Sequence, residues 1–155
     1  MRLPPSTFTD LPAKVQAELQ QRGCTVPQTF GGGRPHNVIS GRFTTSEQLD
    51  FAVLCSVNRS SSILVFRGGS AREVAEIAPI PDAGYLQVVN PGEIGFSRAI
   101  STVDAEYIRE HHEQYGGPEP PSVLDHDGID DAFAEKASVV WYWHDGRWLR
   151  LTGSD

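Results

Sequence analysis

The closing segment, residues 129–152, has the clearest pattern of apolar and polar positions in the chain. A short acidic run is followed by an apolar run, the dipeptide Asp145-Gly146 and a second apolar run. An Asp-Gly pair between two such runs predicts a β-hairpin with a two-residue turn. The turn fixes the expected cross-strand partners: His144 with Arg147, Trp143 with Trp148, Tyr142 with Leu149, Trp141 with Arg150 and Val140 with Leu151.

This register predicts two chemically different faces for the hairpin, because side chains alternate along a strand. One face is aliphatic and phenolic, and we expect it to pack on the core: Val140, Tyr142, Leu149 and Leu151. The other face holds all three tryptophans of the chain beside a guanidinium: Trp141, Trp143, Trp148 and Arg150.

The same kind of pattern predicts an antiparallel meander over residues 37–67. Three strand-like runs, at 37–44, 50–57 and 62–67, are separated by segments of turn composition. The middle run, FAVLCSV, is apolar on both faces, so we expect it to be covered on both sides. Two further strands are predicted at 85–89 and 95–101 around the turn Asn90-Pro91-Gly92. Residues 71–78 are ambiguous: Val74, Ile77 and Ala78 suit a helix, alternation suits a strand poorly, and tertiary context could override either. Pro79 and Pro81 should end the segment in both cases.

Two amphipathic helices complete the prediction. The first spans residues 11–22, with Asp10 as its N-cap and Gly23 as its stop, and the second spans 103–115, capped by Ser101 or Thr102. A chain of 155 residues with 15 glycines and 11 prolines favours one domain rich in turns. The predicted fold class is therefore α+β: antiparallel β-meanders with two amphipathic helices packed on them in a single domain, 1–155.

The charge of the chain limits the classes of partner that it is expected to bind. The formal net charge is −7, and the stretch from Asp104 to Glu135 holds ten carboxylates and one base, Arg109. Such a surface repels phosphate backbones, so we expect no nucleic-acid partner. No apolar run reaches the roughly 20 residues of a membrane span, and the first residues lack the apolar core of a secretory signal. As written, the chain is expected to be soluble.

Cys24 and Cys55 are the two cysteines of the chain. In an oxidising compartment they could pair and close a loop of about 30 residues, which would stabilise the fold by roughly 3 to 4 kcal/mol. The alternative is two reduced, buried thiols that pack as small apolar side chains. Neither cysteine belongs to a CxxC motif, so metal or thioredoxin-like chemistry has no support.

The tryptophan face is the first candidate site. Indole rings beside a guanidinium are typical of surfaces that bind a peptide or a carbohydrate, so Trp141, Trp143, Trp148 and Arg150 are candidate binding residues. The alternative is that these tryptophans pack inside the protein or form a cross-strand ladder that holds the hairpin together.

The acidic turn before the hairpin is the second candidate site. Asp125, Asp127 and Asp131 resemble the alternate carboxylates of loops that wrap Ca²⁺, although the Gly comes at the fourth position of the run and not the sixth. The alternative is a solvated turn. His126, between two aspartates, is a further candidate for a small hydrolase, but no nucleophile is recognisable beside it and no GxSxG or SxxK motif occurs.

The segment Gly41 to Val53, GRFTTSEQLDFAV, resembles an FG-GAP or VCBS-type repeat, in which a Gly-x-Phe strand, an acidic loop and an Asp-x-Ala-Val strand follow one another. Gly41, Phe43, Asp50, Ala52 and Val53 match, whereas Thr44, Ser46 and Glu47 stand where aspartates would hold calcium. The closing hairpin resembles the end of bacterial secreted proteins with such repeats, which finish in a terminal Asp, here Asp155. The resemblance implies a β-rich, extracytoplasmic bacterial module.

These observations favour a non-catalytic binding or protein-interaction module over an enzyme. The expected partner is a protein or a carbohydrate, and the expected location is periplasmic or secreted. The two alternatives are a calcium-stabilised structural domain and a small hydrolase around His126 with its neighbouring aspartates.

Overall fold

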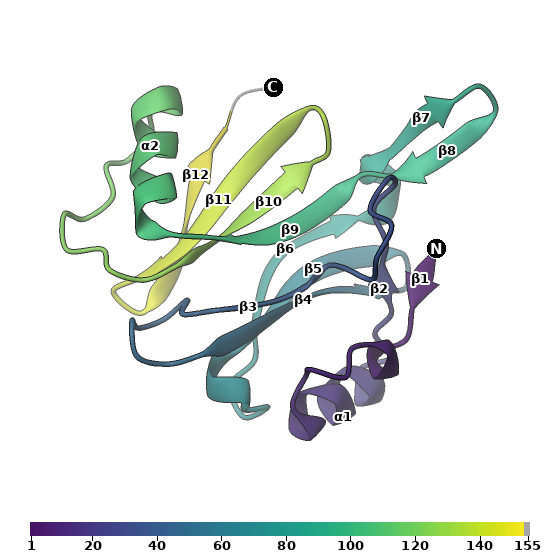
Figure 1. The fold of residues 1–155 in the computed structure, drawn as a ribbon, viewed down its shortest axis with the longest axis horizontal. Helices are drawn as coiled ribbons and strands as arrows, with labels where there is room; N and C mark the ends of the chain where they lie inside the picture. The colour runs from purple at the N-terminus through teal and green to yellow at the C-terminus, as the bar shows by residue number, and fades with distance from the viewer. Residues whose placement is uncertain (154–155) are drawn as a thin grey trace.

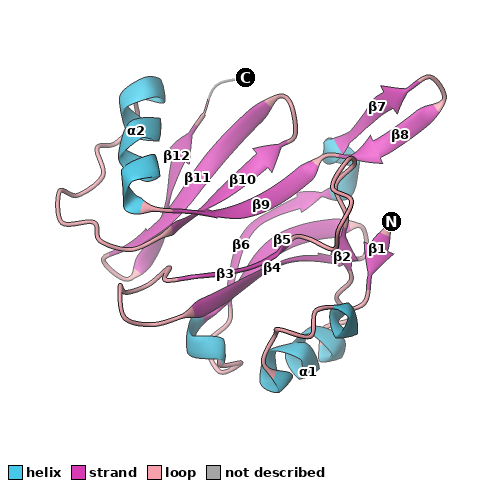
Figure 2. Ribbon diagram, in the orientation of Figure 1, coloured by secondary structure: helices cyan, strands magenta, loops and turns pink. Residues whose placement is uncertain are grey.

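The computed structural model describes residues 1–153 and shows two four-stranded antiparallel sheets, each covered on its outer side by one helix (Figures 1 and 2). The first sheet has the order β3-β4-β5-β6 and the second the order β12-β11-β10-β9. Two two-stranded sheets, β1-β2 and β7-β8, lie outside them. The strands are β1 (Arg2–Leu3), β2 (Val26–Pro27), β3 (Val38–Gly41), β4 (Asp50–Val57), β5 (Ser60–Phe66), β6 (Ala75–Pro81), β7 (Leu86–Asn90), β8 (Glu93–Phe96), β9 (Arg98–Val103), β10 (Gly128–Phe133), β11 (Ala137–His144) and β12 (Arg147–Thr152). The helices are α1 (Ala13–Gln21) and α2 (Ala105–Tyr115), with short 3-10 turns η1 (Pro5–Thr7), η2 (Arg67–Gly69) and η3 (Asp82–Tyr85).

The layers follow the order α1, first sheet, second sheet, α2, and an apolar cluster fills each of the three spaces between them. The middle space, between the two sheets, is lined by Phe43, Ala52, Leu54, Ile63, Val65, Ile77, Ile100 and Ile129. β4 contributes to two spaces, because Ala52 and Leu54 face the second sheet whereas Val53 and Cys55 face α1. This confirms that β4 is covered on both sides. The α+β class with helices packed on antiparallel meanders is also confirmed.

The closing hairpin has the register that its sequence predicts. Each of the five predicted pairs is present, from His144 with Arg147 to Val140 with Leu151. The turn residues Asp145 and Gly146 both have positive φ, 51° and 77°, as a type I′ turn requires. The predicted core face packs under α2: Val140, Tyr142 and Leu151 are buried there, with Leu149 beside them.

Three local predictions are wrong. The ambiguous segment forms strand β6 over residues 75–81, and Pro79 and Pro81 do not end it, because the strand continues through both. β6 is an edge strand with a bulge between its pairings to Ser61 and Ile63, so the missing proline N–H groups cost no ladder bond in the sheet interior. α1 starts after Pro12 and not after Asp10. The N-cap of α2 is Asp104, whose side chain accepts a hydrogen bond of 2.8 Å from the Tyr107 N–H.

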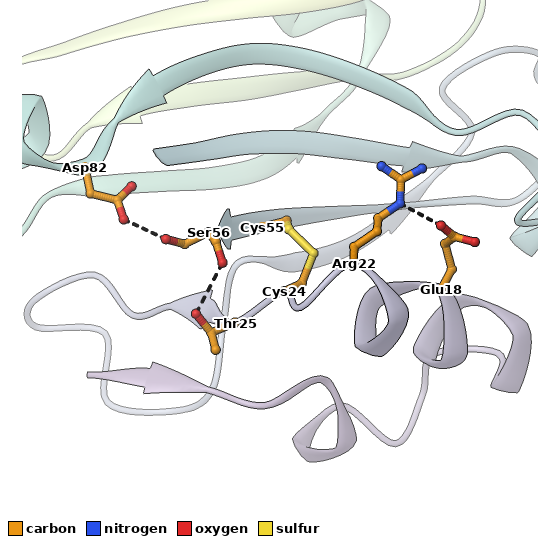
Figure 3. The surroundings of a disulfide bond; sticks show 7 residues. All are labelled: Glu18, Arg22, Cys24, Thr25, Cys55, Ser56 and Asp82. Carbon is orange, nitrogen blue, oxygen red and sulfur yellow. Dashed lines mark hydrogen bonds and ion pairs between the residues drawn. A yellow bond between two sulfur atoms is a disulfide. The ribbon is translucent and has the colours of Figure 1, made fainter. Parts of the chain in front are cut away.

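The two cysteines are bonded, as the first of the two sequence interpretations proposed. Cys24 follows α1 and Cys55 lies on β4, with their Cα atoms 5.3 Å apart, so the disulfide ties the helix to the first sheet (Figure 3). Next to it, the Ser56 hydroxyl donates to Oδ2 of Asp82 at 2.6 Å. The junction of helix and sheet is thus fixed by a covalent bond and by buried polar contacts.

Asn37 joins the two sheets where β3 and β9 run side by side. Its Nδ2 donates to the Pro27 carbonyl at 2.8 Å and to the Thr29 hydroxyl at 3.1 Å. Its Oδ1 accepts from the Ile100 N–H of β9 at 3.1 Å. Asn37 is buried and has a φ of 70°, in the left-handed region that asparagine tolerates better than most residues. The Asn37 side chain therefore connects the start of the first sheet to β9 of the second sheet through a buried hydrogen bond.

Candidate functional site

The tryptophans on β11 and β12 face the first sheet. Trp141 and Trp148 are half-buried and pack against the apolar cluster between the sheets, and the Nε1 atom of each is buried without a hydrogen-bond partner in the described part of the chain. Because the opposite face of the hairpin packs under α2, strand alternation turns these rings toward the other sheet. This packing matches the alternative in which the tryptophans pack inside the protein.

Trp143 lies at the rim of the same layer. The Arg67 guanidinium stands over its ring, 4.1 Å from the centroid, and the Trp148 ring meets it edge-on at 5.8 Å. Arg150 is exposed, across the ladder from Trp141. Trp141, Trp143, Trp148 and Arg150 therefore do not form the open aromatic surface that the sequence indicated. The hairpin pattern predicted that these residues share a face, but it could not reveal that the first sheet packs against this face.

The acidic turn is fixed by contacts with its neighbours. His126 Nε2 donates to the Trp143 carbonyl at 2.6 Å, because a carbonyl can only accept, and its Nδ1 lies 3.2 Å from Oδ1 of Asp125. Asp127 exchanges two bonds with the Arg42 backbone, accepting at 2.9 Å and donating at 2.7 Å. His126 therefore joins the turn to the end of β11, and both of its ring nitrogens are engaged.

Asp131 is separated from the other two carboxylates of the proposed calcium loop. It lies on β10, is buried between the sheets and forms a bidentate pair with Arg98, with Nε–Oδ1 at 2.9 Å and Nη2–Oδ2 at 2.8 Å. Among residues 1–153, no three His, Cys, Asp or Glu side chains are grouped so as to hold a metal ion. The structure does not bring Asp131 together with Asp125 and Asp127, because Asp131 faces the core with its charge already paired.

The segment that resembles an FG-GAP repeat is organised around Asp50. This fully buried carboxylate accepts from the N–H groups of Phe43 and Thr44 at 3.1 Å each, and from the Gly68 N–H at 2.8 Å. These hydrogen bonds fix the loop between β3 and β4. The family resemblance stays a prediction, and Asp155, which entered it, lies outside the described residues.

The feature that sequence reasoning missed is an arm formed by β7 and β8, which projects from the body at the upper right of Figure 1. Leu86 pairs with Phe96 and Val88 pairs with Ile94, so all four side chains point to the same face of the arm. Phe96 packs against the core between the sheets, whereas Leu86, Val88 and Ile94 are 50%, 73% and 67% exposed. An apolar stripe thus starts in the core and continues into solvent.

The base of the arm is held firmly. The Tyr85 ring lies 5.3 Å from the Phe133 ring and 6.1 Å from the Phe96 ring, and the Arg98 guanidinium is 5.1 Å from the Tyr85 centroid. Burial raises the pKa of the Tyr85 hydroxyl, although the nearby Arg98 charge opposes the shift. The Phe30 N–H also donates to the Phe96 carbonyl at 2.9 Å. These contacts present the apolar face in a fixed direction.

A hollow of about 400 Å³ lies beside the arm. It is lined by Phe30, Gly31, Gln87, Val88, Val89, Asn90, Glu93 and Glu135. Two carboxylates and no basic side chain are among these residues. The hollow is therefore lined by apolar, polar and acidic side chains.

Comparisons of this chain with protein-family models, with curated proteins and with solved structures found no match. Within residues 1–153, no helix is both long and apolar enough to cross a membrane.

Proposed function

We propose that the protein is a non-catalytic interaction module that binds a partner protein along the exposed apolar face of the β7–β8 arm. The observation that carries the proposal is the stripe of Leu86, Val88 and Ile94, which continues from the core and is covered by nothing in the described chain. Contiguous apolar surface on a folded protein marks an interaction site. A two-stranded hairpin is marginally stable in water by itself, so a partner that covers this face would also stabilise the arm.

The charge around the arm supports a basic partner. Residues 85–97 contain one carboxylate, Glu93, and no Lys or Arg, and the hollow beside the arm adds Glu135. The whole chain carries a formal charge of −7. A second copy of the chain would bring like charges together, whereas a protein with an apolar groove bordered by Lys and Arg would gain attraction as well as burial.

The outer edges of the arm offer a second kind of contact. β7 and β8 pair only with each other within the described residues, although the Phe30 N–H occupies the Phe96 carbonyl. Unpaired strand edges bind extended segments of other proteins through backbone hydrogen bonds. This favours a protein partner over a carbohydrate, for which the buried tryptophans supply no open platform.

An extracytoplasmic location belongs to the same proposal. The disulfide between Cys24 and Cys55 supports it, because such bonds persist in oxidising compartments. A protein that meets its partner outside the cytoplasm would also benefit from the covalent tie between α1 and the first sheet. Blocking of free thiols at cell lysis should therefore leave both cysteines unlabelled in protein taken from the native host.

Site-specific photo-cross-linking in the native host tests the interaction. A photoreactive side chain at position 88 should give one dominant cross-linked protein. The control position is 123, because Val123 is 77% exposed but lies in the loop between α2 and β10, on the other side of the molecule from the arm (Figure 1). Absence of a product at position 88, or the same product from both positions, would overturn the proposal.

A further inference from the structure

A second hollow, of about 130 Å³, lies between α2 and the second sheet. It is lined by Tyr107, Glu110, His111, Gln114, Tyr115 and Ser138. The aromatic residues follow one another at intervals of four along α2, so they share one face of the helix. The ring centroids of Tyr107 and His111 are 6.2 Å apart and those of His111 and Tyr115 are 4.8 Å apart. The hollow therefore has a continuous aromatic wall.

His111 is held in place by the end of the chain's last strand. Its Nε2 lies 3.2 Å from the Thr152 carbonyl, and a carbonyl can only accept a hydrogen bond, so Nε2 carries a proton. His111 is 4% exposed, whereas Tyr107 and Tyr115 are each 39% exposed. One wall ring is thus fixed in the protein, and the two rings beside it are accessible from solvent.

A carboxylate lies next to this wall. Asp130 is opposite Val140 in the ladder between β10 and β11, which makes Ser138 its diagonal neighbour on the face that looks toward α2. Burial raises the pKa of Asp130, while the Ser138 hydroxyl and His111 oppose the shift. The Asp130 charge in turn contributes to the raised pKa of Tyr107, after the effect of burial. Three residues that line the hollow, Ser138, His111 and Tyr107, therefore interact with the Asp130 carboxylate.

One oxygen of this carboxylate has no partner. Oδ1 of Asp130 is buried and accepts no hydrogen bond from the described residues. An unpaired buried carboxylate oxygen is costly, and such groups in native proteins are normally satisfied by a donor, a water molecule or a cation. Asp131, its neighbour in sequence, points to the other face of the sheet and is neutralised by Arg98. Asp130 is half-buried, and the charge of its carboxylate, unlike that of Asp131, is not paired with an Arg or Lys side chain of the described residues.

We propose that this hollow binds a small organic ammonium ion, with the cation against the rings of Tyr107 and Tyr115 and its charge balanced by Asp130. Aromatic rings attract cations through their electron-rich faces, and cages of this type select alkylated ammonium groups. The volume is about four times the roughly 30 Å³ that one water molecule occupies in the liquid, which suits a compact head group. Glu110 at the lining adds a second negative charge. This site is independent of the arm.

Titration with choline tests the proposal, and the matched control ligand is its neutral carbon isostere, dimethylbutanol. Choline should shift the NMR signals of the tyrosine rings and raise the melting temperature, because a ligand that binds only the folded state stabilises it. The isostere should do neither. Equal binding of the two ligands, or no response to excess choline, would overturn the proposal.

Variants locate the site. Tyr107→Ala should weaken choline binding by about tenfold through loss of one aromatic wall, and Asp130→Asn should abolish it. Glu106→Gln is the control, because Glu106 is exposed on the first turn of α2 and does not line the hollow. Tyr107 is 39% exposed, so its truncation leaves the core intact. Choline binding that survives Asp130→Asn, or that is lost equally in Glu106→Gln, would contradict the assignment.

Discussion

Arg98 and Asp131 form a doubly hydrogen-bonded ion pair inside the protein, and the same guanidinium connects the two sheets. Beyond the carboxylate, Arg98 Nη1 donates to the Ser61 carbonyl at 2.8 Å and Nη2 donates to the Ala78 carbonyl at 3.0 Å. Arg98 and Asp131 belong to the second sheet, whereas Ser61 and Ala78 belong to the first. Arg98 is completely buried, and its bonds to Asp131 and to the Ser61 carbonyl form away from water.

Asp131→Asn should therefore destabilise the fold by about 3 to 5 kcal/mol, because it leaves the Arg98 charge buried without a counter-charge. Urea unfolding measures the change in free energy. Arg22→Ala removes the ion pair between Arg22 and Glu18 on the surface of α1, and it should cost no more than about 1 kcal/mol. Equal costs for the two variants would contradict a structural role for the buried pair.

Asn37→Gly should also destabilise the protein, by at least about 2 kcal/mol. The substitution keeps the backbone free to adopt the φ of 70° but removes the side-chain bonds that join β3 to β9, leaving the Ile100 N–H without an acceptor. Asn58→Gly is the matched control, since Asn58 also has a positive φ but is exposed in a turn. Chemical denaturation that gives the same stability for both variants would show that the side-chain bridge is unimportant.

Removal of the disulfide should lower the free energy of unfolding by about 3 to 4 kcal/mol. The bond closes a loop across a sequence separation of 31 residues, and the loss of this constraint favours the unfolded chain. The variant with both Cys24→Ala and Cys55→Ala should melt at a lower temperature than the native protein, and reductant should lower only the melting temperature of the native protein. A native melting temperature that ignores reductant would contradict this expectation.

Asp130 should make the stability depend on pH. Burial raises its pKa above the ordinary value of 3.8, so the folded chain holds this proton where the unfolded chain has released it. Ionisation of Asp130 therefore opposes folding: the penalty is absent below the ordinary pKa, grows as pH rises toward the native pKa and is complete above it. Asp130→Asn should melt at a higher temperature than the native protein at neutral pH, and the difference should vanish below a pH of about 4. Equal melting temperatures at neutral pH would contradict the shift.

Much of the fold could be predicted from local pattern. The Asp145-Gly146 turn specified the register of the closing hairpin, and the apolar run of β4 indicated a strand covered on both faces. Pro79 and Pro81 were wrongly predicted to end their segment, because the prolines of an edge strand are tolerated only in the context of the whole sheet. Both helices start two residues later than predicted, because the cap depends on the direction from which the preceding chain approaches the helix, and this direction is set by the tertiary structure.

The candidate sites were harder to predict than the fold. Which face of the β11–β12 hairpin is covered depends on the first sheet, whose strands come from residues 38–81, so Trp141 and Trp148 could not be placed from their own segment. The exposed stripe was missed for a related reason. Leu86, Val88 and Ile94 have the composition of ordinary core strands, and only the tertiary structure shows that their hairpin leaves both sheets.

The central claim is that the β7–β8 arm is an interaction surface. It is tested most directly by the affinity of the protein for the partner that cross-linking identifies, measured with both proteins purified. Val88→Thr combined with Ile94→Thr should leave the unfolding free energy within about 0.5 kcal/mol, because both side chains are exposed and threonine suits a strand. The same variant should weaken partner binding by about a hundredfold, since two apolar anchors are lost, whereas Val123→Thr should bind like the native protein. Unchanged affinity in the arm variant, with the fold intact, would contradict the account.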